Sequence, residues 1–166
     1  MLEGRPQYVS FNHLRRPFCR GLDVDEVPGS DRAAYRTHMP VKPGLATSVT
    51  LLVEERDTAV ALGSGDVPVL GTPRVVALCE QAAVEAVADE LPEGATTVGY
   101  AVQLSHMAPT PVGHKITAEA ILETVEGRRL TFRVTVNDAR GLVAAGRLTR
   151  VVVERARFIE RAHGES

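Results

Sequence analysis

The chain has 166 residues, 44% of them hydrophobic, and a formal net charge of −2. This length is typical of a single domain with a substantial core, and the charge offers no basic excess for a nucleic-acid partner. The sequence contains no apolar run of about 18 residues and no signal-peptide segment, which predicts a cytoplasmic protein with no membrane partner. Cys19 and Cys79 are too few for a disulfide framework or a zinc site, so no metal is expected, and Cys79 is predicted to be a buried, reduced thiol.

The first 43 residues differ from the rest of the chain. They contain five of the ten prolines and show no sustained apolar period of 2 or 3.6 residues. The sequence therefore predicts an irregular N-terminal extension over residues 1–43, a domain over residues 44–160 and a C-terminal tail over residues 161–166. Arg15, Arg16 and Arg20 in the extension are interpreted as solvated loop side chains rather than as a phosphate site.

Regular elements begin at residue 46. Residues 46–53 and 58–62 predict two strands joined by a turn at 54–57, and residues 72–91 predict a helix with Thr72 as its N-cap and Pro73 as its first residue. Four long strands are predicted to follow, at residues 96–106, 114–125, 129–138 and 141–154. Because the breaks between them are short, each strand is expected to be the antiparallel neighbour of the next.

This order of elements predicts the fold class. One long helix followed by a meander of antiparallel strands is typical of an α+β domain in which a curved sheet wraps around a central helix. The sequence has no glycine-rich dinucleotide motif after a strand and no P-loop, so a nucleotide-binding fold is not indicated.

Glu80 is the most informative residue of the predicted helix. At about 100° per residue, Arg74, Gln81 and Glu85 fall on the side that faces water, whereas Glu80 falls on the opposite side, among valines and alanines. A carboxylate buried there is costly unless it is paired or hydrogen-bonded, and acids in such surroundings are disproportionately catalytic. Two other interpretations stay open: a misjudged helix face, and a buried acid that is satisfied by backbone amides.

Thr72, Glu80 and His106 form a candidate hydrolytic set. A carboxylate can act as base or nucleophile, an imidazole can transfer protons, and a hydroxyl can orient or polarise a substrate. Taken singly, Thr72 is better interpreted as a helix cap and His106 as a strand-end histidine. His114 lies one loop further along and competes with His106 for the proton-transfer role.

Several stretches resemble the fluoroacetyl-CoA thioesterase group of hotdog-fold proteins. The stretches are Val67 to Pro73, the alanine-rich helix with Glu80, Thr97-Val98-Gly99, His106, Pro109 to Gly113, and Val125 to Leu130. The resemblance extends over about residues 46 to 160, without a gap from Thr72 to Arg150.

The resemblance implies a hotdog fold and a particular set of site residues. The family's catalytic threonine, glutamate and histidine fall on Thr72, Glu80 and His106. A strand glycine that helps to hold the acyl thioester falls on Gly99, and an arginine that contacts the CoA portion falls on Arg150. The resemblance also implies a homodimer with its active sites at the subunit interface, and no cofactor besides the CoA that belongs to the substrate.

Two features depart from the family pattern. The fluoroacetyl-specific enzyme has an aromatic gate six residues before the threonine, where this chain has Asp66, so selectivity for a fluorinated acyl group is not expected. The second departure is the extension over residues 1–43, which has no obvious counterpart.

The function expected from the sequence is hydrolysis of an acyl thioester, carried by CoA or by a carrier protein. In this interpretation Glu80 is the nucleophile or the general base, and His106 transfers protons. Thr72 positions Glu80 or polarises the carbonyl, and the Gly99 amide steadies the oxyanion. The alternative is a non-hydrolytic protein that binds acyl thioesters on the same fold. A dehydratase is a third reading, but its usual order, with the histidine before the helix that carries the acid, is not found.

Overall fold

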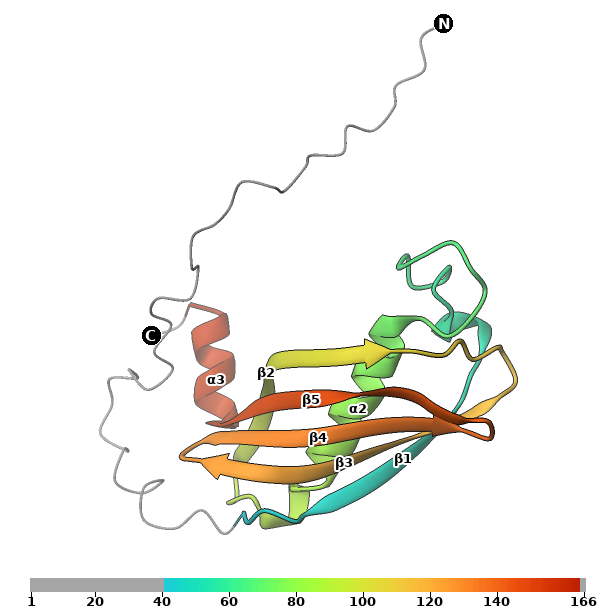
Figure 1. Cartoon of the computed structure of the whole chain (residues 1–166). Coiled ribbons are helices and arrows are strands. Elements are labelled where there is room, and N and C mark those ends of the chain that lie inside the picture. Colours follow the sequence, from blue (N-terminus) through green and yellow to red (C-terminus); the bar gives the residue numbers. More distant parts are fainter. Residues whose placement is uncertain (1–40, 165–166) are drawn as a thin grey trace, which may run out of the picture. The chain divides into compact units, whose positions relative to one another are not determined.

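The structure, a computed structural model, describes residues 41–164. The predictions for Cys19 and for the three arginines of the extension therefore lie outside the described residues. The elements, shown in Figure 1, are β1 (Ala46–Leu52), the 3₁₀ helix η1 (Glu55–Asp57), α2 (Thr72–Glu85), the 3₁₀ helix η2 (Ala88–Glu90), β2 (Ala95–His106), β3 (Lys115–Glu126), β4 (Arg129–Asp138), β5 (Gly141–Glu154) and α3 (Arg155–Ala162).

The five strands form one antiparallel sheet in the order β1-β3-β4-β5-β2. The long helix α2 crosses one face of this sheet (Figure 1) and contacts all five strands. The predicted α+β class, with a central helix and a curved antiparallel sheet, is confirmed. No helix among residues 41–164 is long and apolar enough to cross a membrane.

One predicted strand pairing is wrong. Residues 96–106 and 114–125 were expected to be neighbours, but β2 pairs with β5 at one edge of the sheet, and β3 pairs with β1 and β4. The link between β2 and β3 crosses the end of the sheet instead of forming a hairpin. It bonds to other segments there: the N–H of Met107 donates to Val143, and the N–H of Gly113 donates to Val53. Pro109 and Pro111, which have no N–H to donate, suit such a crossing. The consequence is that β2 is an edge strand.

Two predicted elements between β1 and the end of α2 also differ. Residues 58–62 were expected to be a strand, but only Thr58 forms a bridge, with Leu70, and turns follow. The local cause is η1, which the Glu54 and Asp57 side chains close as a reciprocal cap. The long helix was expected to reach residue 91, but α2 ends at Glu85 and only the short η2 follows. A C-terminal helix, α3, was not predicted; the Glu154 carboxylate caps it by accepting from two backbone N–H groups.

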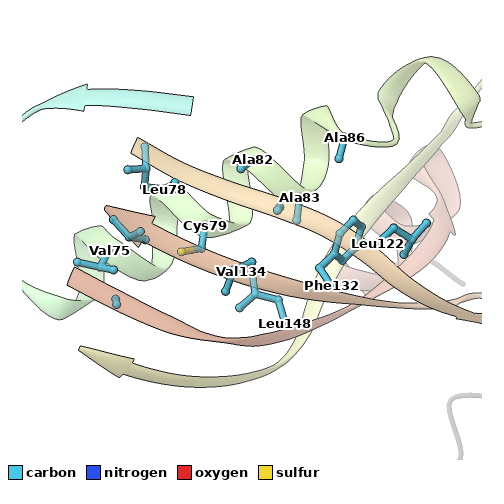
Figure 2. Packing of buried hydrophobic residues seen from close by; sticks show 14 of the residues in the cluster. Val75, Leu78, Cys79, Ala82, Ala83, Ala86, Leu122, Phe132, Val134 and Leu148 are labelled. Carbon is cyan, nitrogen blue, oxygen red and sulfur yellow. The ribbon is translucent and has the colours of Figure 1, made fainter. Parts of the chain in front are cut away.

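The core lies between α2 and the sheet. Figure 2 shows Val75, Leu78, Cys79, Ala82 and Ala83 of α2 together with four side chains of the strands, which are Leu122, Phe132, Val134 and Leu148. Cys79 is fully buried, as predicted, and burial, helped by the neighbouring charge of Glu80, raises the pKa of its thiol to about 11. Small residues in the middle of the helix let it approach the sheet around Phe132, which is fully buried.

Candidate active site

Thr72 and His106 meet where the start of α2 faces the end of β2. Thr72 was predicted to be the N-cap of the helix. The N-cap is instead the preceding residue, Gly71, and Thr72 is the first residue of α2. The Thr72 hydroxyl is consequently free of a capping bond. Its Oγ1 lies 3.0 Å from Nδ1 of His106, the last residue of β2. His114 is exposed before β3 and has no such contact, so the structure brings His106, and not His114, to Thr72.

The imidazole of His106 is held on one side only. Its Nε2 is buried and has no hydrogen-bond partner among the described residues. When the Thr72 hydroxyl donates to Nδ1, the neutral ring carries its proton on Nε2. A threonine hydroxyl against an imidazole nitrogen is the arrangement of a nucleophile with its general base. The unmatched Nε2 marks the other side of the ring as a place for a further polar group.

The Thr72–His106 pair lines a cavity of about 330 Å³. Most of its wall is apolar or small, and the wall comes from the segment between η1 and α2 and from the segment after β2. The lining residues are Ala59, Ser64, Gly65, Val67, Val69, Leu70, Gly71, Thr72, His106, Met107, Ala108 and Pro109. The exposed lining combines apolar and polar atoms, and a concave site in which a few polar groups converge among apolar side chains can bind a small molecule. Asp66 is exposed and is not among the lining residues, although both of its neighbours are.

Glu80 lies two turns further along α2 and is paired with a buried arginine. Its Oε1 accepts a hydrogen bond of 2.8 Å from Nη1 of Arg150, on β5. The Glu80 side chain is 35% exposed, and that of Arg150 is 7% exposed. The expectation of a fully buried acid is therefore wrong: Glu80 is half-buried and satisfied by a guanidinium, not by backbone amides. The apolar face was only partly placed correctly: the fully buried side of α2 is centred on Val75, Cys79 and Ala82, and Glu80 lies at its border, between the half-buried Val76 and Val84.

Arg150 is fixed by the first residues of β2 as well as by Glu80. Its Nε donates to the Thr97 hydroxyl at 3.0 Å, and its Nη2 donates to the Thr97 carbonyl at 2.9 Å. Burial lowers the pKa of Arg150, and the negative charge and hydrogen bond of Glu80 act in the opposite sense. A buried arginine needs such partners, so three of its five donors are already engaged within the chain.

Gly99 provides the space in which Glu80 lies. It is directly opposite Arg150 in the β2–β5 ladder, next to a bulge between Gly99 and Ala101. A Cβ atom on Gly99 would overlap the Glu80 carboxylate and would lie 3.8 Å from Nη1 of Arg150. A side chain at this position would therefore displace the carboxylate. The sequence had singled out Gly99 through the family resemblance, whereas the structure supplies this steric reason for a glycine.

The five predicted site residues thus fall into two groups along one helix. Thr72 and His106 form one group, and Glu80, Gly99 and Arg150 form the other. The eight-residue spacing of Thr72 and Glu80 corresponds to about 12 Å along the helix axis. Among residues 41–164, no cluster of three or more histidine, cysteine, aspartate or glutamate side chains is placed to hold a metal ion.

Sequence reasoning missed the groups that support these residues. Thr97, which binds Arg150, lies two residues before Gly99. Asp57 and Arg74 are also missed; Arg74 had been assigned to the water-facing side of the helix, yet its Nε donates to the buried Asp57 at 2.8 Å. Arg150 itself had been named through the family resemblance, and its pattern gives a second signal: it is a charged residue on the helix-facing side of β5, between the buried Leu148 and Val152.

The central helix α2 and the five-stranded antiparallel sheet define a class, the hotdog-fold proteins. A family model described as fluoroacetyl-CoA-specific thioesterase matches residues 53–156. The chain belongs to this family, as the sequence had predicted. The fluoroacetyl-CoA thioesterase of Streptantibioticus cattleyicolor is 38% identical over 90 residues, which are 54% of this chain and 65% of that protein. The match thus spans less than two thirds of the relative's length.

Solved structures give the same family. The crystal structure of the fluoroacetyl-CoA thioesterase FlK has a TM-score of 0.71 and 29% identity, over 76% of this chain and 98% of that one. A hot-dog-like protein from Thermanaerovibrio acidaminovorans has a TM-score of 0.68 and 28% identity, over 74% and 90% of the two chains. A thioesterase superfamily member from Thermus thermophilus has a TM-score of 0.67 and 26% identity, over 77% and 100%. The predicted hotdog fold is confirmed. Variants of FlK have been crystallised with acetyl-CoA, and with fluoroacetate and CoA.

Proposed function

We propose that this chain hydrolyses an acyl thioester, carried by CoA or by a carrier protein, to a free acid and a thiol. The observation that carries the proposal is the 3.0 Å contact between the Thr72 hydroxyl and His106 at the wall of a cavity with both polar and apolar lining. A hydroxyl that already touches a general base is ready to attack a carbonyl carbon placed in that cavity. Family membership supports the same reaction class.

In the proposed mechanism, Thr72 Oγ1 attacks the thioester carbonyl while His106 Nδ1 accepts the hydroxyl proton. The C–S bond then breaks, and the departing thiolate takes that proton from the imidazole. Water hydrolyses the resulting acyl-threonine ester and restores the Thr72 hydroxyl. Because Glu80 lies about 12 Å further along the helix axis than Thr72, its carboxylate is proposed to act as the general base through bridging water. The backbone N–H of Gly99 is proposed to stabilise the oxyanion of the second step, because Gly99 packs directly against the Glu80 carboxylate.

The first role proposed for Arg150 is to orient the Glu80 carboxylate. Its guanidinium is buried and fixes the carboxylate at 2.8 Å, so the carboxylate keeps one orientation. A contact of Arg150 with the CoA portion, as the resemblance implies, would use the N–H groups that Thr97 and Glu80 leave free. Both roles place Arg150 in the substrate site.

The protein is proposed to act as a homodimer that is closed along β2. This edge strand has unpaired backbone groups, and its Tyr100 and Val102 are about half exposed, at 49% and 47%. A second copy that pairs with this edge would remove a site of uncontrolled strand pairing and would cover the side of α2 that carries Glu80. Light scattering is expected to give twice the chain mass of 17.9 kDa. A monomer that retains activity would contradict this proposal. A cytoplasmic location is proposed in addition, since Cys79 is a free thiol.

The test of hydrolysis is release of free thiol from a panel of short and medium acyl-CoAs, with binding followed separately by calorimetry. Release by the wild type supports the proposal, whereas binding without release identifies a non-hydrolytic thioester-binding protein. The nucleophile is tested by mass spectrometry after rapid quenching. An acyl adduct on a peptide that contains Thr72 is expected, and an adduct on Glu80 would overturn the order of steps given above.

A further inference from the structure

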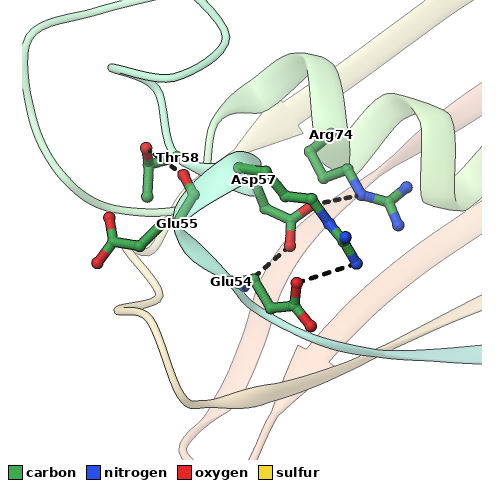
Figure 3. Close-up of polar contacts among 6 residues, drawn as sticks. Glu54, Glu55, Asp57, Thr58 and Arg74 are labelled. Carbon is green, nitrogen blue, oxygen red and sulfur yellow. Dashed lines mark hydrogen bonds and ion pairs between the residues drawn. The ribbon is translucent and has the colours of Figure 1, made fainter.

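Asp57 is a buried carboxylate outside both groups of site residues. It is 3% exposed at the end of η1, and both of its side-chain oxygens are engaged (Figure 3). Oδ1 accepts from Nε of Arg74 at 2.8 Å, and Oδ2 accepts from the N–H of Glu54 at 2.9 Å. The main-chain carbonyl of Asp57 accepts a third bond, of 2.9 Å, from the N–H of Gly71, the N-cap of α2. One residue therefore holds the segment before η1 and the first turn of α2 together.

These bonds close the segment that forms one wall of the cavity. Six of the lining residues lie between positions 59 and 70, and the bonds of Asp57 to Gly71 and Arg74 tie the two ends of this segment together. The closure continues just inside the loop, where the N–H of Ala59 donates to Val69 at 2.8 Å and Thr58 forms a bridge with Leu70. Asp57, through its carboxylate and its backbone carbonyl, thus anchors both ends of the wall segment, and the backbone bonds of Ala59 and Leu70 hold the segment just inside these ends.

Asp57 also fixes the residue proposed to attack the substrate. Gly71 and Arg74 lie on either side of Thr72 in the first turn of α2, and both are bound to Asp57. A shift of this turn would move the Thr72 hydroxyl away from the His106 imidazole. Displacements of about 1 Å by remote substitutions cost on the order of 10²-fold in rate, so the position of this turn matters for chemistry.

We propose that Asp57 and Arg74 are positioning residues for acyl transfer: they hold Thr72 against His106 and hold the wall segment in place. The inference rests on the proposed function, because it presumes that Thr72 and His106 carry the reaction. In this ion pair the Asp57 side chain is buried, at 4% exposed, and the Arg74 side chain is half-buried, at 27%. Stability alone does not account for such a pair, since burying a carboxylate offsets much of the gain from pairing it. A neighbouring pair offers a comparison: Arg56 and Glu54 are 2.9 Å apart but largely exposed, at 77% and 49%.

The kinetic test uses Asp57→Asn with Arg56→Gln as the matched control. Both variants are assayed for thiol release at a temperature where circular dichroism shows them folded. For Asp57→Asn, kcat is expected to fall by about tenfold or more, with a smaller change in KM, and Arg56→Gln is expected to behave as the wild type. In a Thr72→Ala background, Asp57→Asn is expected to cause no further loss of kcat, because its effect passes through Thr72. An equal loss in both backgrounds would overturn the proposal.

A second measurement does not depend on activity. The ring nitrogens of His106 are followed by NMR, with the other histidines assigned by substitution. Asp57→Asn is expected to change the His106 Nδ1 signal in the same direction as Thr72→Ala does, because both weaken the Thr72–His106 bond. A variant that melts earlier while it keeps the wild-type kcat and His106 signal would show that the pair is merely structural. If the wild type releases no thiol from any substrate, the proposed function fails, and the NMR result still decides whether Asp57 positions Thr72.

Discussion

Glu80→Gln is the substitution for which the structure makes the most specific prediction. The amide is nearly the same size as the carboxylate and still offers an oxygen to Arg150, so the fold should persist. The change removes the general base, and this loss is expected to lower kcat by on the order of 10²-fold. From the sequence alone, neutralising a buried acid would leave stability unchanged or raise it, but the pairing with Arg150 reverses this expectation.

The magnitude follows from the burial of the two partners. Breaking a fully buried ion pair costs roughly 3–5 kcal/mol. Here Arg150 is 7% exposed, while Glu80 is 35% exposed and partly solvated. The amide also keeps one hydrogen bond, so we expect a loss of about 1–2 kcal/mol. At about 2–4 °C per kcal/mol, the melting temperature should fall by about 2–8 °C.

The assay combines thiol release with thermal melting, and Glu85→Gln is the control. Glu85 is exposed on the same helix and accepts a bond only from Gln81, at 3.0 Å, as far as the described contacts show. The control should match the wild type in both measurements. Wild-type kcat for Glu80→Gln would remove Glu80 from the mechanism. An unchanged melting temperature would show that Glu80 and Arg150 are not coupled as the structure has them.

Three further predictions concern the core, the thiol and selectivity. Phe132→Ala should cost about 3–5 kcal/mol in a urea unfolding experiment, because Phe132 is fully buried under α2; a loss below about 1 kcal/mol would mean that the helix does not pack there. In a Cys19→Ser background, Cys79 should resist a thiol reagent at pH 8 in the folded protein, because burial raises its pKa to about 11 and keeps it protonated; rapid labelling would contradict this. Because Asp66 is exposed and supplies no apolar lid, kcat/KM for fluoroacetyl-CoA and acetyl-CoA should be similar; a ratio above about 10³ would show that another residue is the gate.

The parts of the fold that could be predicted are those set by local periodicity. The start of α2 follows from Pro73, and β3, β4 and β5 follow from long alternating segments with tight turns. The order of the sheet could not be predicted in the same way. It depends on where the link after β2 crosses, and this is decided by bonds to Val53 and Val143, far away in the sequence.

In the candidate site, too, features that are local in the sequence could be predicted, and contacts between distant residues could not. Glu80 was found because a charged residue on an apolar helix face is a local anomaly. Arg150 was named by the family resemblance, but its pairing with Glu80 was not predicted, because the two are 70 positions apart and meet only when α2 packs against β5. Asp57 was missed for a related reason: an acidic residue in a charged turn gives no sign that it is buried until α2 packs against it. Thr72 and His106 were grouped with Glu80 as a candidate hydrolytic set, which the family resemblance supported, and their contact needed the tertiary structure.

The central claim is that Thr72 and His106 together carry the hydrolysis of an acyl thioester. The most direct measurement is kcat for thiol release by the wild type, Thr72→Ala and Thr50→Ala; Thr50 is an exposed threonine on β1, at the opposite edge of the sheet from β2. We predict that the wild type and Thr50→Ala turn over equally, and that Thr72→Ala loses about 10²-fold or more. Turnover by Thr72→Ala at the wild-type rate would contradict the claim.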